Sequence, residues 1–166
     1  MDWTFRPIGT IRSPFVKQEG TPIQPCFAHD ARGEIILDET FAPALKDLEG
    51  FERIWVLHVL DRSTSWEPLV KPYLDDVKRG VFAVRSPARP NPIGLSCLRL
   101  VGIEGSILFV AELDILDGTP VLDIKPYVPR FDCYPNVRAG WLDQTNSRAF
   151  KADGRFEKKP GNGEDG

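Results

Sequence analysis

The feature that most constrains the fold is the short interval at which turn-forming residues interrupt apolar runs in the second half of the chain. Residues 95–104 and 107–115 are two such runs, and Gly105-Ser106 alone separates them, which is the pattern of a β-hairpin. Asp117-Gly118 supplies another turn signal before the strand-like residues 121–125. Short strands alternating with turns are typical of an all-β sheet or barrel. The sequence therefore predicts a mainly β fold.

The first half of the chain adds more strands and one short helix. The segment 51–60 (FERIWVLHVL) is a nearly continuous apolar run, which suits a strand buried on both faces, although its length also fits a helix. Residues 42–49 are expected to form the short helix, because Leu45 and Leu48 have helical spacing and Gly50 would end it. The other predicted strands are residues 3–13, 33–37 and 81–84.

A proline-rich segment, RSPARPNPIG at residues 85–94, follows the predicted strand 81–84. Its prolines fix the backbone φ angle repeatedly and remove hydrogen-bond donors, so we expect a stiff loop. A rigid scaffold often carries its binding residues on such loops, although proline turns also occur simply to end strands. Residues 14–30 are predicted to form a second long loop, because glycine and proline punctuate them.

Composition and length are those of one folded domain. The chain has 166 residues, of which 42% are hydrophobic and 27% charged, and that length fits a single core. We expect a single β-barrel domain over residues 1–150 and a flexible, Gly- and charge-rich tail over residues 151–166. No apolar run reaches the roughly 20 residues of a membrane helix, and the first residues lack the layout of a signal peptide. We therefore expect a cytoplasmic protein that does not bind a membrane.

Metal and nucleotide-binding motifs of the common kinds are absent from the sequence. The three cysteines are widely spaced, with no C-x-x-C pair, which argues against disulfides and against a zinc site. We expect no metal, and the two histidines, His29 and His58, are interpreted as structural or surface residues. A cysteine nucleophile paired with His58 stays open as an alternative. There is no G-x-G-x-x-G, P-loop, G-x-S-x-G or H-E-x-x-H motif, so a Rossmann-type site is not expected.

The formal net charge of −3 argues against a nucleic-acid partner, but the charge is unevenly distributed. Residues 77–103 contain no acidic side chain and five basic ones. This window is either a local basic patch or a solvated surface with scattered arginines. Its basic residues are Lys78, Arg79, Arg85, Arg89 and Arg99.

Three polar side chains stand at the end of the predicted strand 121–125. Strand alternation puts Asp123 and Lys125 on the same face, and Tyr127 follows if the extended chain continues. A carboxylate, an ammonium and a phenol in a row could form the wall of a reaction site. The alternative is an exposed ion pair, which would contribute little to stability.

Five stretches of the sequence together resemble the TsaA-like, or TrmO, family of tRNA adenine-N6 methyltransferases. They are PIGTIRSPF (7–15), QPCF (24–27), FERIWVLHVLDR (51–62), GVFAVRSPARPNPIGLS (80–96) and LDILDGTPVLDIKPY (113–127). The resemblance implies a β-barrel methyltransferase without a Rossmann fold, which uses S-adenosyl-L-methionine and works as a homodimer with the cofactor near the subunit interface. It implies as substrate the adenosine just 3′ of the tRNA anticodon, in the anticodon loop, already carrying threonylcarbamoyl on N6.

The resemblance also implies which residues bind the cofactor. The family often has a His-Gln-like pair at the position where this chain has Asp61-Arg62. The cofactor-binding residues carried over by motif are Pro25, Cys26, Phe27, Asp61, Arg62, Arg85, Leu95, Ala111, Glu112, Leu113 and Asp114.

The chemistry of such a reaction suggests roles for the remaining polar residues. The acceptor nitrogen is a poor nucleophile, so its N–H needs a hydrogen-bond acceptor or base. Asp123 is the candidate, with Tyr127 as the alternative, and Lys125 would hold a carboxylate or phosphate of the substrate. Asn91, which precedes Pro92, resembles part of the (Asn/Asp)-Pro-Pro-aromatic loop of other amino-methyltransferases and is a candidate for catalysis and substrate binding.

Arg85 and Arg89 would meet phosphates or the cofactor carboxylate, because a guanidinium group matches such oxyanions. Arg89 is therefore the further candidate for substrate binding. Two other functions stay open: a β-barrel that binds RNA without modifying it, and a module that senses S-adenosyl-L-methionine without transferring its methyl group.

Overall fold

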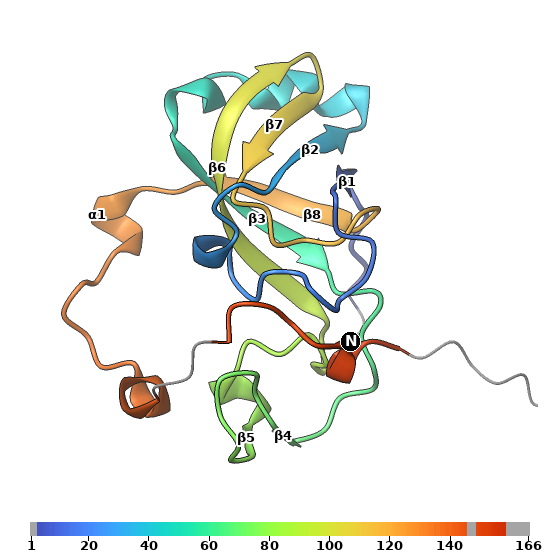
Figure 1. Cartoon of the computed structure of the whole chain (residues 1–166). Coiled ribbons are helices and arrows are strands. Elements are labelled where there is room, and N and C mark those ends of the chain that lie inside the picture. The colour runs from blue at the N-terminus through green and yellow to red at the C-terminus, as the bar shows by residue number, and fades with distance from the viewer. Residues whose placement is uncertain (1–2, 146–148, 159–166) are drawn as a thin grey trace, which may run out of the picture.

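Six antiparallel strands close into a barrel in the computed structural model, which describes residues 3–145 and 149–158 (Figure 1). Neighbouring strands around the barrel follow the order β1-β2-β7-β6-β3-β8. This confirms the predicted mainly β, barrel-type fold. The strands are β1 (Gly9–Arg12), β2 (Arg32–Leu37), β3 (Arg53–Val59), β6 (Ile93–Glu104), β7 (Ile107–Ala111) and β8 (Pro120–Pro126).

The long strand β6 joins the two halves of the barrel. Its first half pairs with β3, from Ile93 opposite Val59 to Arg99 opposite Arg53. Its second half pairs with β7 in the predicted hairpin, and Gly105 turns between them with a φ of +60°. Glycine adopts this left-handed conformation without steric cost. A strand shared in this way has to curve, and Figure 1 shows β6 bending across the barrel wall.

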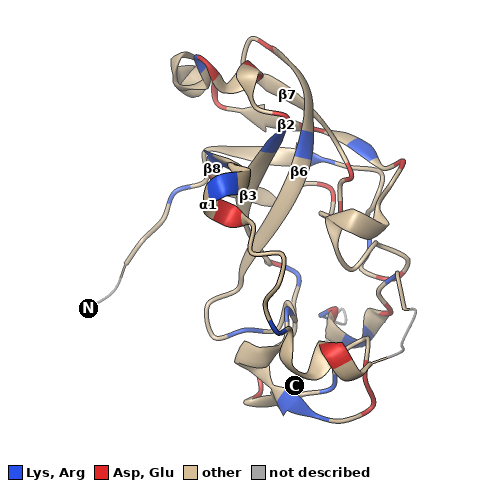
Figure 2. Cartoon of the chain, turned by 90° about the vertical axis from the view of Figure 1, so that its left-hand side faces the viewer, with Lys and Arg blue, Asp and Glu red and all other residues tan. Residues whose placement is uncertain are grey.

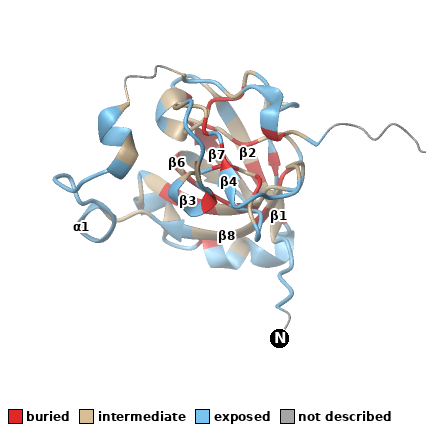
Figure 3. Cartoon of the chain, turned by 90° about the horizontal axis from the view of Figure 1, so that it is seen from below, coloured by how far each residue is buried: buried red, intermediate tan, exposed pale blue. Residues whose placement is uncertain are grey.

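The interior of the barrel is filled by one face of each strand. In β3 the residues Ile54, Val56 and His58 are buried, while their neighbours are only partly covered. The prediction that this run is buried on both faces was therefore wrong, because the outer face of β3 is a barrel surface. Figure 3 shows the buried positions gathered inside the barrel. The core includes Ile11, Ile35, Leu98, Leu108, Val110, Leu113 and Val121.

A β-bulge in β8 decides which way its polar residues point. Val121 lies opposite His58 and Asp123 lies opposite Leu57, so Leu122 is an extra residue on β8. Such a bulge reverses the alternation of inward and outward side chains. Val121 is buried on one side of the bulge and Ile124 packs on the core on the other. Asp123 and its neighbour at 125 are thereby directed to the outside.

The short helices differ from the expectation of one helix at 42–49. The structure has two 3₁₀ helices, η2 (Glu39–Leu45) and η3 (Leu48–Gly50), with Pro43 inside the first. Proline removes a backbone donor, so a longer regular helix is not formed there. Asp38 caps η2 by accepting a 2.9 Å hydrogen bond from the backbone N–H of Thr40.

The predicted strand at 81–84 was wrong. Val81–Ala83 form the 3₁₀ helix η4, and the strand pairing lies just before it, between β4 (Leu69–Val70) and β5 (Arg79–Gly80). The cause is visible in the burial of the segment, where Val81 is buried but the next two residues, Phe82 and Ala83, are both exposed. The apolar run therefore does not face a core on alternate positions.

The chain after β8 crosses to this small β4–β5 hairpin. It contains α1 (Pro129–Asp132) and η5 (Gly140–Gln144), and the Trp141 indole N–H donates to the carbonyl of Ala83 at 2.8 Å. All residues from 129 to 140 are exposed. We call residues 129–140 the strap, and Figure 1 shows it leaving the barrel at α1 and descending toward β5.

Residues 149–158 pack on the domain, so the ordered chain extends past the expected boundary at residue 150. The helix η6 (Gly154–Phe156) buries Phe156 against Val70, Val81 and Ala88. The rest of the predicted tail, residues 159–166, lies outside the described residues. In the described part of the chain, no helix has the length and apolar character needed to cross a membrane.

Candidate functional site

The predicted cofactor-binding residues come together at one end of the barrel, which we call the mouth. The helix η1 (Pro25–Phe27) lies there beside β6, and Phe27 packs on Phe150 with ring centroids 4.9 Å apart. The segment Ala111–Asp114 leaves β7 at the same end, and the Leu113 N–H donates to the carbonyl of Ala31 at 3.2 Å. Two long loops and the end of β7 thus position these residues.

Asp114 is the most perturbed acid of the mouth. Its carboxylate accepts a 2.7 Å hydrogen bond from the Ser96 hydroxyl. Burial raises the pKa of Asp114 to about 7, and the hydrogen bond from Ser96 and the charge of Arg85 only partly offset that rise. Near neutral pH this carboxyl group therefore exists in both its protonated and its charged form.

His58 lies behind Ser96, inside the barrel. Its Nε2 is 3.4 Å from the Ser96 Oγ, and its Nδ1 is buried with no hydrogen-bond partner in the part of the chain that the structure describes. Burial lowers the pKa of His58 to about 4, so the ring is neutral at physiological pH. His58 stands opposite Gly94 in the β3–β6 pairing, and a methyl group at position 94 would overlap the imidazole ring. Gly94 therefore provides the space for this histidine.

Cys26 and Arg85 face Asp114 from the two loops of the mouth. Arg85 donates a 2.7 Å hydrogen bond to the Gln24 side-chain oxygen. Partial burial raises the pKa of the Cys26 thiol, and the Asp114 carboxylate raises it further. Cys26 is therefore a neutral thiol, and the histidine of the alternative cysteine–histidine pair contacts Ser96 instead.

Glu112 is held on the outside of the mouth by two arginines. Its carboxylate accepts hydrogen bonds of 2.8 and 3.1 Å from Arg53 and lies 3.5 Å from Arg99. Arg53 and Arg99 are directly opposite each other in the β3–β6 pairing, so the carboxylate relieves their repulsion. Glu112 also has a φ of +60°, a conformation that non-glycine residues seldom adopt.

Asp61, Arg62 and Asn91 lie at the same end of the barrel, where β3 ends and β6 begins. The Leu60 N–H donates to the Pro92 carbonyl at 2.7 Å, which joins the two segments. Arg62 points into the turn after residue 116, where its guanidinium group donates to the Asp117 carbonyl and, at 3.3 Å, to the Val16 carbonyl. Asp61 and Asn91 are exposed.

The candidate catalytic residues share the outer face of the barrel. Lys125 Nζ lies 2.7 Å from the Asp123 carboxylate, and both side chains are about half exposed, at 62% and 45%. Tyr127 packs edge-on against Trp55, with ring centroids 5.6 Å apart. Partial burial and the neighbouring Cys133 raise the pKa of Tyr127, so it is a neutral phenol. The three residues therefore form a row, as the alternation predicted.

One cross-strand row links this outer face to the mouth. Leu95 lies opposite Leu57, and Leu57 lies opposite Asp123. Two inter-strand spacings correspond to about 10 Å between the backbones of Leu95 and Asp123. A ligand that rests on Leu95 at the mouth would therefore be within reach of the Asp123 carboxylate.

The basic window at 77–103 does not form one patch. Arg79 pairs with Asp75 at 2.6 Å, and Arg99 is the residue beside Glu112. Arg89 donates to the carbonyls of Val81 and Val84 at 3.1 and 2.6 Å, so it joins the loop to η4. Figure 2 shows Lys and Arg dispersed over the barrel and the lower part of the molecule. The interpretation as scattered arginines fits better.

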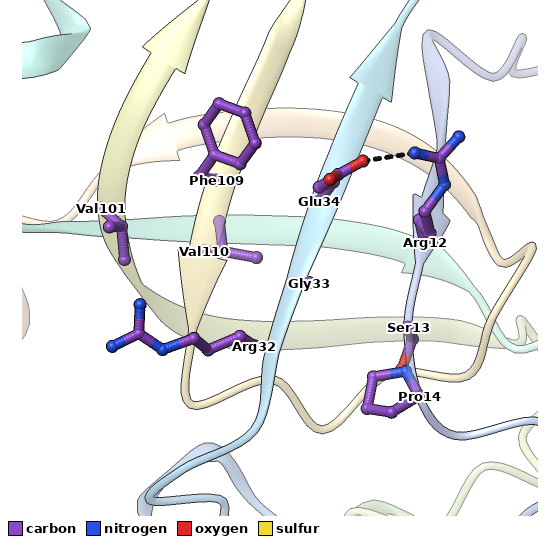
Figure 4. Close-up of a pocket in the computed structure, with 9 residues that line it drawn as sticks. All are labelled: Arg12, Ser13, Pro14, Arg32, Gly33, Glu34, Val101, Phe109 and Val110. Carbon is purple, nitrogen blue, oxygen red and sulfur yellow. Dashed lines mark hydrogen bonds and ion pairs between the residues drawn. The ribbon is translucent and has the colours of Figure 1, made fainter.

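A groove of about 560 Å³ lies on another side of the barrel, across β1, β2, β7 and the second half of β6 (Figure 4). The Arg12–Glu34 ion pair, 2.7 Å long, spans its rim, and Phe109 and Val101 lie beside it. The groove does not contact the residues expected to bind cofactor. We therefore take the mouth, where the residues expected from the sequence motifs gather, as the candidate site.

Among residues 3–145 and 149–158, no group of three or more metal-ligating side chains comes together, and the three cysteines are free. Ser96, Gln24 and the role of His58 were not predicted from the sequence. The signal for the last was its place in β3 on the same face as Ile54 and Val56. A histidine on the apolar face of a core strand requires a partner, and the partner is on the neighbouring strand.

Comparison with known proteins gives the same assignment for most of the chain. Residues 10–133 match the family described as the tRNA-methyltransferase O N-terminal domain. A "Probable S-adenosyl-L-methionine-binding protein" of Pyrococcus abyssi is 49% identical over 154 residues, which are 92% of this chain and 84% of that protein. A tRNA (adenine(37)-N6)-methyltransferase of Escherichia coli is 39% identical over 147 residues, which are 82% of this chain and 63% of that protein.

The crystal structure of TrmO from Pseudomonas aeruginosa superimposes with a TM-score of 0.72 and 40% sequence identity, over 84% of this chain and 62% of that chain. The chain thus spans less than two thirds of the length of the Escherichia coli and Pseudomonas aeruginosa proteins. Barrel topology, motifs and overall similarity agree, and the chain belongs to the tRNA-methyltransferase O family, whose N-terminal domain it contains.

Proposed function

We propose that this protein is an S-adenosyl-L-methionine-dependent methyltransferase that methylates N6 of adenine 37 in tRNA. The observation that carries the proposal is the continuous row from Leu95 at the mouth to Asp123 on the outer face. It joins a candidate cofactor site to a candidate acceptor of a proton. The names and similarity of the Escherichia coli and Pseudomonas aeruginosa relatives support it.

The side chains at the mouth fit the chemistry of the cofactor. S-adenosyl-L-methionine supplies a methyl group bound to a positively charged sulfur, and it also carries an ammonium group, a carboxylate and an adenine. Arg85 is exposed and can receive the carboxylate, and Asp114 is an acid suited to a positive charge. Leu95, 52% exposed, and Phe27 offer apolar surface to the adenine.

On the outer face, Asp123 would accept the N–H proton of the adenine and orient its nitrogen. Its carboxylate also accepts a 2.9 Å hydrogen bond from the backbone N–H of Ile124, which fixes the side chain. Tyr127 is less suited to act as a base because its raised pKa keeps it protonated. Asn91, exposed beside the start of β6, is a further hydrogen-bonding group for the substrate.

The specific substrate we propose is adenosine that already carries threonylcarbamoyl on N6, next to the anticodon. The Lys125 side chain is 62% exposed, and its ammonium group can receive the additional carboxylate of that group. The guanidinium group of Arg89 donates to backbone carbonyls, so Arg89 would contribute to substrate binding by holding the proline-rich loop in its conformation. A tRNA substrate is in keeping with action in the cytoplasm.

We propose that the protein acts as a homodimer. The strap supports this, because its twelve consecutive residues 129–140 are all exposed and include large apolar side chains. Phe131, Tyr134 and Val137 are 59%, 72% and 68% exposed. Exposed apolar segments of this size commonly mark contact surfaces. Figure 3 shows the strap standing apart from the buried core.

A second candidate function is binding of S-adenosyl-L-methionine without methyl transfer. The name of the Pyrococcus abyssi relative, whose length this chain nearly matches, favours it. A single experiment on the full chain distinguishes these two functions. Incubation with methyl-labelled S-adenosyl-L-methionine and tRNA, followed by nucleoside analysis, should give label on N6 of adenine 37. Tight cofactor binding with no label in any tRNA would favour the binding protein.

A further inference from the structure

A chain of polar groups passes from the barrel interior to the mouth. It begins at His58 on β3, continues through Ser96 on β6 and ends at Asp114 after β7. His58 and Ser96 are 5% and 3% exposed, and only Asp114 reaches the surface of the mouth. Three different segments thus contribute one residue each to a single connected path through the barrel wall.

The direction of the hydrogen bonds follows from the acceptor at the end of the chain. When Asp114 is charged, the Ser96 hydroxyl donates its one proton to the carboxylate, so its lone pairs face His58. In that state the neutral imidazole carries its proton on Nε2 and leaves Nδ1 as a lone pair, the atom that has no partner among the described residues. A buried polar atom without a partner is costly, and such groups require an explanation.

We propose that Ser96 and His58 are positioning residues, which hold the Asp114 carboxylate at the mouth so that it receives the positive charge of the cofactor. This inference rests on the proposed function, and it assigns roles to two residues of the barrel interior. The neighbouring acid cannot take this role, because Glu112 is already neutralised by Arg53 and Arg99.

This arrangement implies that Asp114 loses a proton when the cofactor binds. The titratable groups that face Asp114 are the charged Arg85 from the proline-rich loop and the neutral Cys26 thiol from η1, with neutral His58 behind Ser96. Because burial raises the pKa of Asp114 to about 7, the free protein holds a proton there part of the time. A bound positive charge favours the carboxylate, so Asp114 releases that proton to solvent when the cofactor binds.

Cofactor affinity should therefore weaken about tenfold for each pH unit below about 7 and level off above it. Ser96→Ala removes a hydrogen bond to the charged form, so the carboxyl group becomes harder to ionise. The midpoint of the pH dependence should move upward by about one pH unit. The loss of affinity should then be large at pH 7 and small at pH 9.

The test has two readouts on the full chain. The first follows the ¹³C signal of the Asp114 carboxyl carbon against pH in the free protein, which needs no cofactor. The second measures binding of S-adenosyl-L-methionine by calorimetry between pH 5.5 and 9. The matched control is Ser86→Ala, because Ser86 is a buried serine whose hydroxyl has no hydrogen-bond partner within residues 3–145 and 149–158. His58→Leu should act as Ser96→Ala does, and His58→Gln, which keeps an N–H donor, should act less.

We expect the midpoint of the Asp114 carboxyl signal and the midpoint of the cofactor affinity, both against pH, to rise in Ser96→Ala. Neither should change in Ser86→Ala. The same binding measurement with S-adenosyl-L-homocysteine, which lacks the positive sulfur but keeps the ammonium group, identifies the charge that Asp114 meets. If the pH dependence of affinity persists, Asp114 meets the ammonium group, and if it is lost, Asp114 meets the sulfur. An Asp114 signal that titrates identically in the wild type and Ser96→Ala would overturn the positioning role. If the midpoint of that signal shifts but the affinity for the cofactor does not depend on pH, Asp114 does not receive the positive charge of the cofactor. No binding by the wild type at any pH would contradict the proposed function itself.

Discussion

Gly94 and His58 face each other across the β3–β6 pairing, and the imidazole ring fills the space that a side chain at position 94 would need. Gly94→Ala should therefore destabilise the protein, because neither the ring nor the strand can move freely inside a packed barrel. We expect a loss of about 1–3 kcal/mol in the free energy of unfolding, measured by urea denaturation. Gly102→Ala on the same strand is the control, since no atom of the described residues outside its immediate neighbours in the chain lies within 4 Å of its added carbon.

An equal loss in the two glycine variants would mean that strand propensity, and not the fit to His58, explains the requirement for glycine. Gly94→Ala should also lose affinity for the cofactor relative to the wild type, and the loss should be larger at pH 7 than at pH 9. The reason is that a displaced His58 no longer supports Ser96.

The buried pair of titratable groups predicts opposite pH dependences for two variants. Burial raises the pKa of Asp114 to about 7 and lowers that of His58 to about 4, whereas unfolded chains have values of about 3.9 and 6.5. Between about pH 4 and 6.5 the folded chain retains a proton on Asp114 and lacks one on His58. The two contributions to the pH dependence of stability therefore nearly cancel in the wild type.

Asp114→Asn leaves only the histidine contribution, so its free energy of unfolding should rise by roughly 3 kcal/mol from pH 4 to 6.5. His58→Leu leaves only the acid, so its stability should fall as pH rises from about 4 to 7. Urea denaturation at several pH values measures both slopes. Parallel slopes in the two variants and the wild type would show that neither group is shifted by burial as described.

Two arginines of the proline-rich loop should behave differently. Arg89 donates to three backbone carbonyls, at 2.6, 3.1 and 3.4 Å, so Arg89→Ala should cost about 1–2 kcal/mol of stability. Arg85 is exposed and bonded to Gln24 alone among the described residues, so Arg85→Ala should change stability by less than about 0.5 kcal/mol. It should instead weaken S-adenosyl-L-methionine binding about tenfold. Unchanged cofactor affinity in Arg85→Ala would remove Arg85 from the site.

Asp123→Asn tests the proposed acceptor of the adenine proton. The amide oxygen can still accept from the Ile124 N–H, so the strand should remain intact. Methyl transfer should fall about a hundredfold while the affinity for S-adenosyl-L-methionine stays within about twofold. Val16→Ala, at an exposed position away from this face, is a control for expression and folding. Normal turnover in Asp123→Asn would exclude the carboxylate from the reaction.

The sequence predicted those parts of the fold that depend on local signals. The hairpin at Gly105-Ser106 and the common face of Asp123 and Lys125 were confirmed, because turn residues and strand alternation specify them. Which side of the barrel that face meets could not be predicted. It depends on the bulge at Leu122 in β8. This bulge is defined by the pairing of β8 with β3, and the sequence of β8 alone does not show it.

The candidate site shows the same division. The family motifs assigned Asp114 to the expected cofactor site, but its hydrogen bond to Ser96 joins residues 18 positions apart. The partner of Arg85, Gln24, is 61 positions away. These contacts arise from strand order and loop packing, which periodicity does not encode. The strand predicted at 81–84 failed for a related reason, since Val81 packs on Phe156 from the far end of the chain.

The proposed reaction is tested most directly by methyl transfer from labelled S-adenosyl-L-methionine to tRNA that does or does not carry threonylcarbamoyl on adenosine 37. Both tRNAs should have the same sequence, and Asp123→Asn should serve as the matched inactive protein. We expect label on N6 of adenine 37 in the threonylcarbamoylated tRNA and none in the unmodified tRNA. Absence of label from both, with cofactor bound by the wild type, would contradict the proposed reaction.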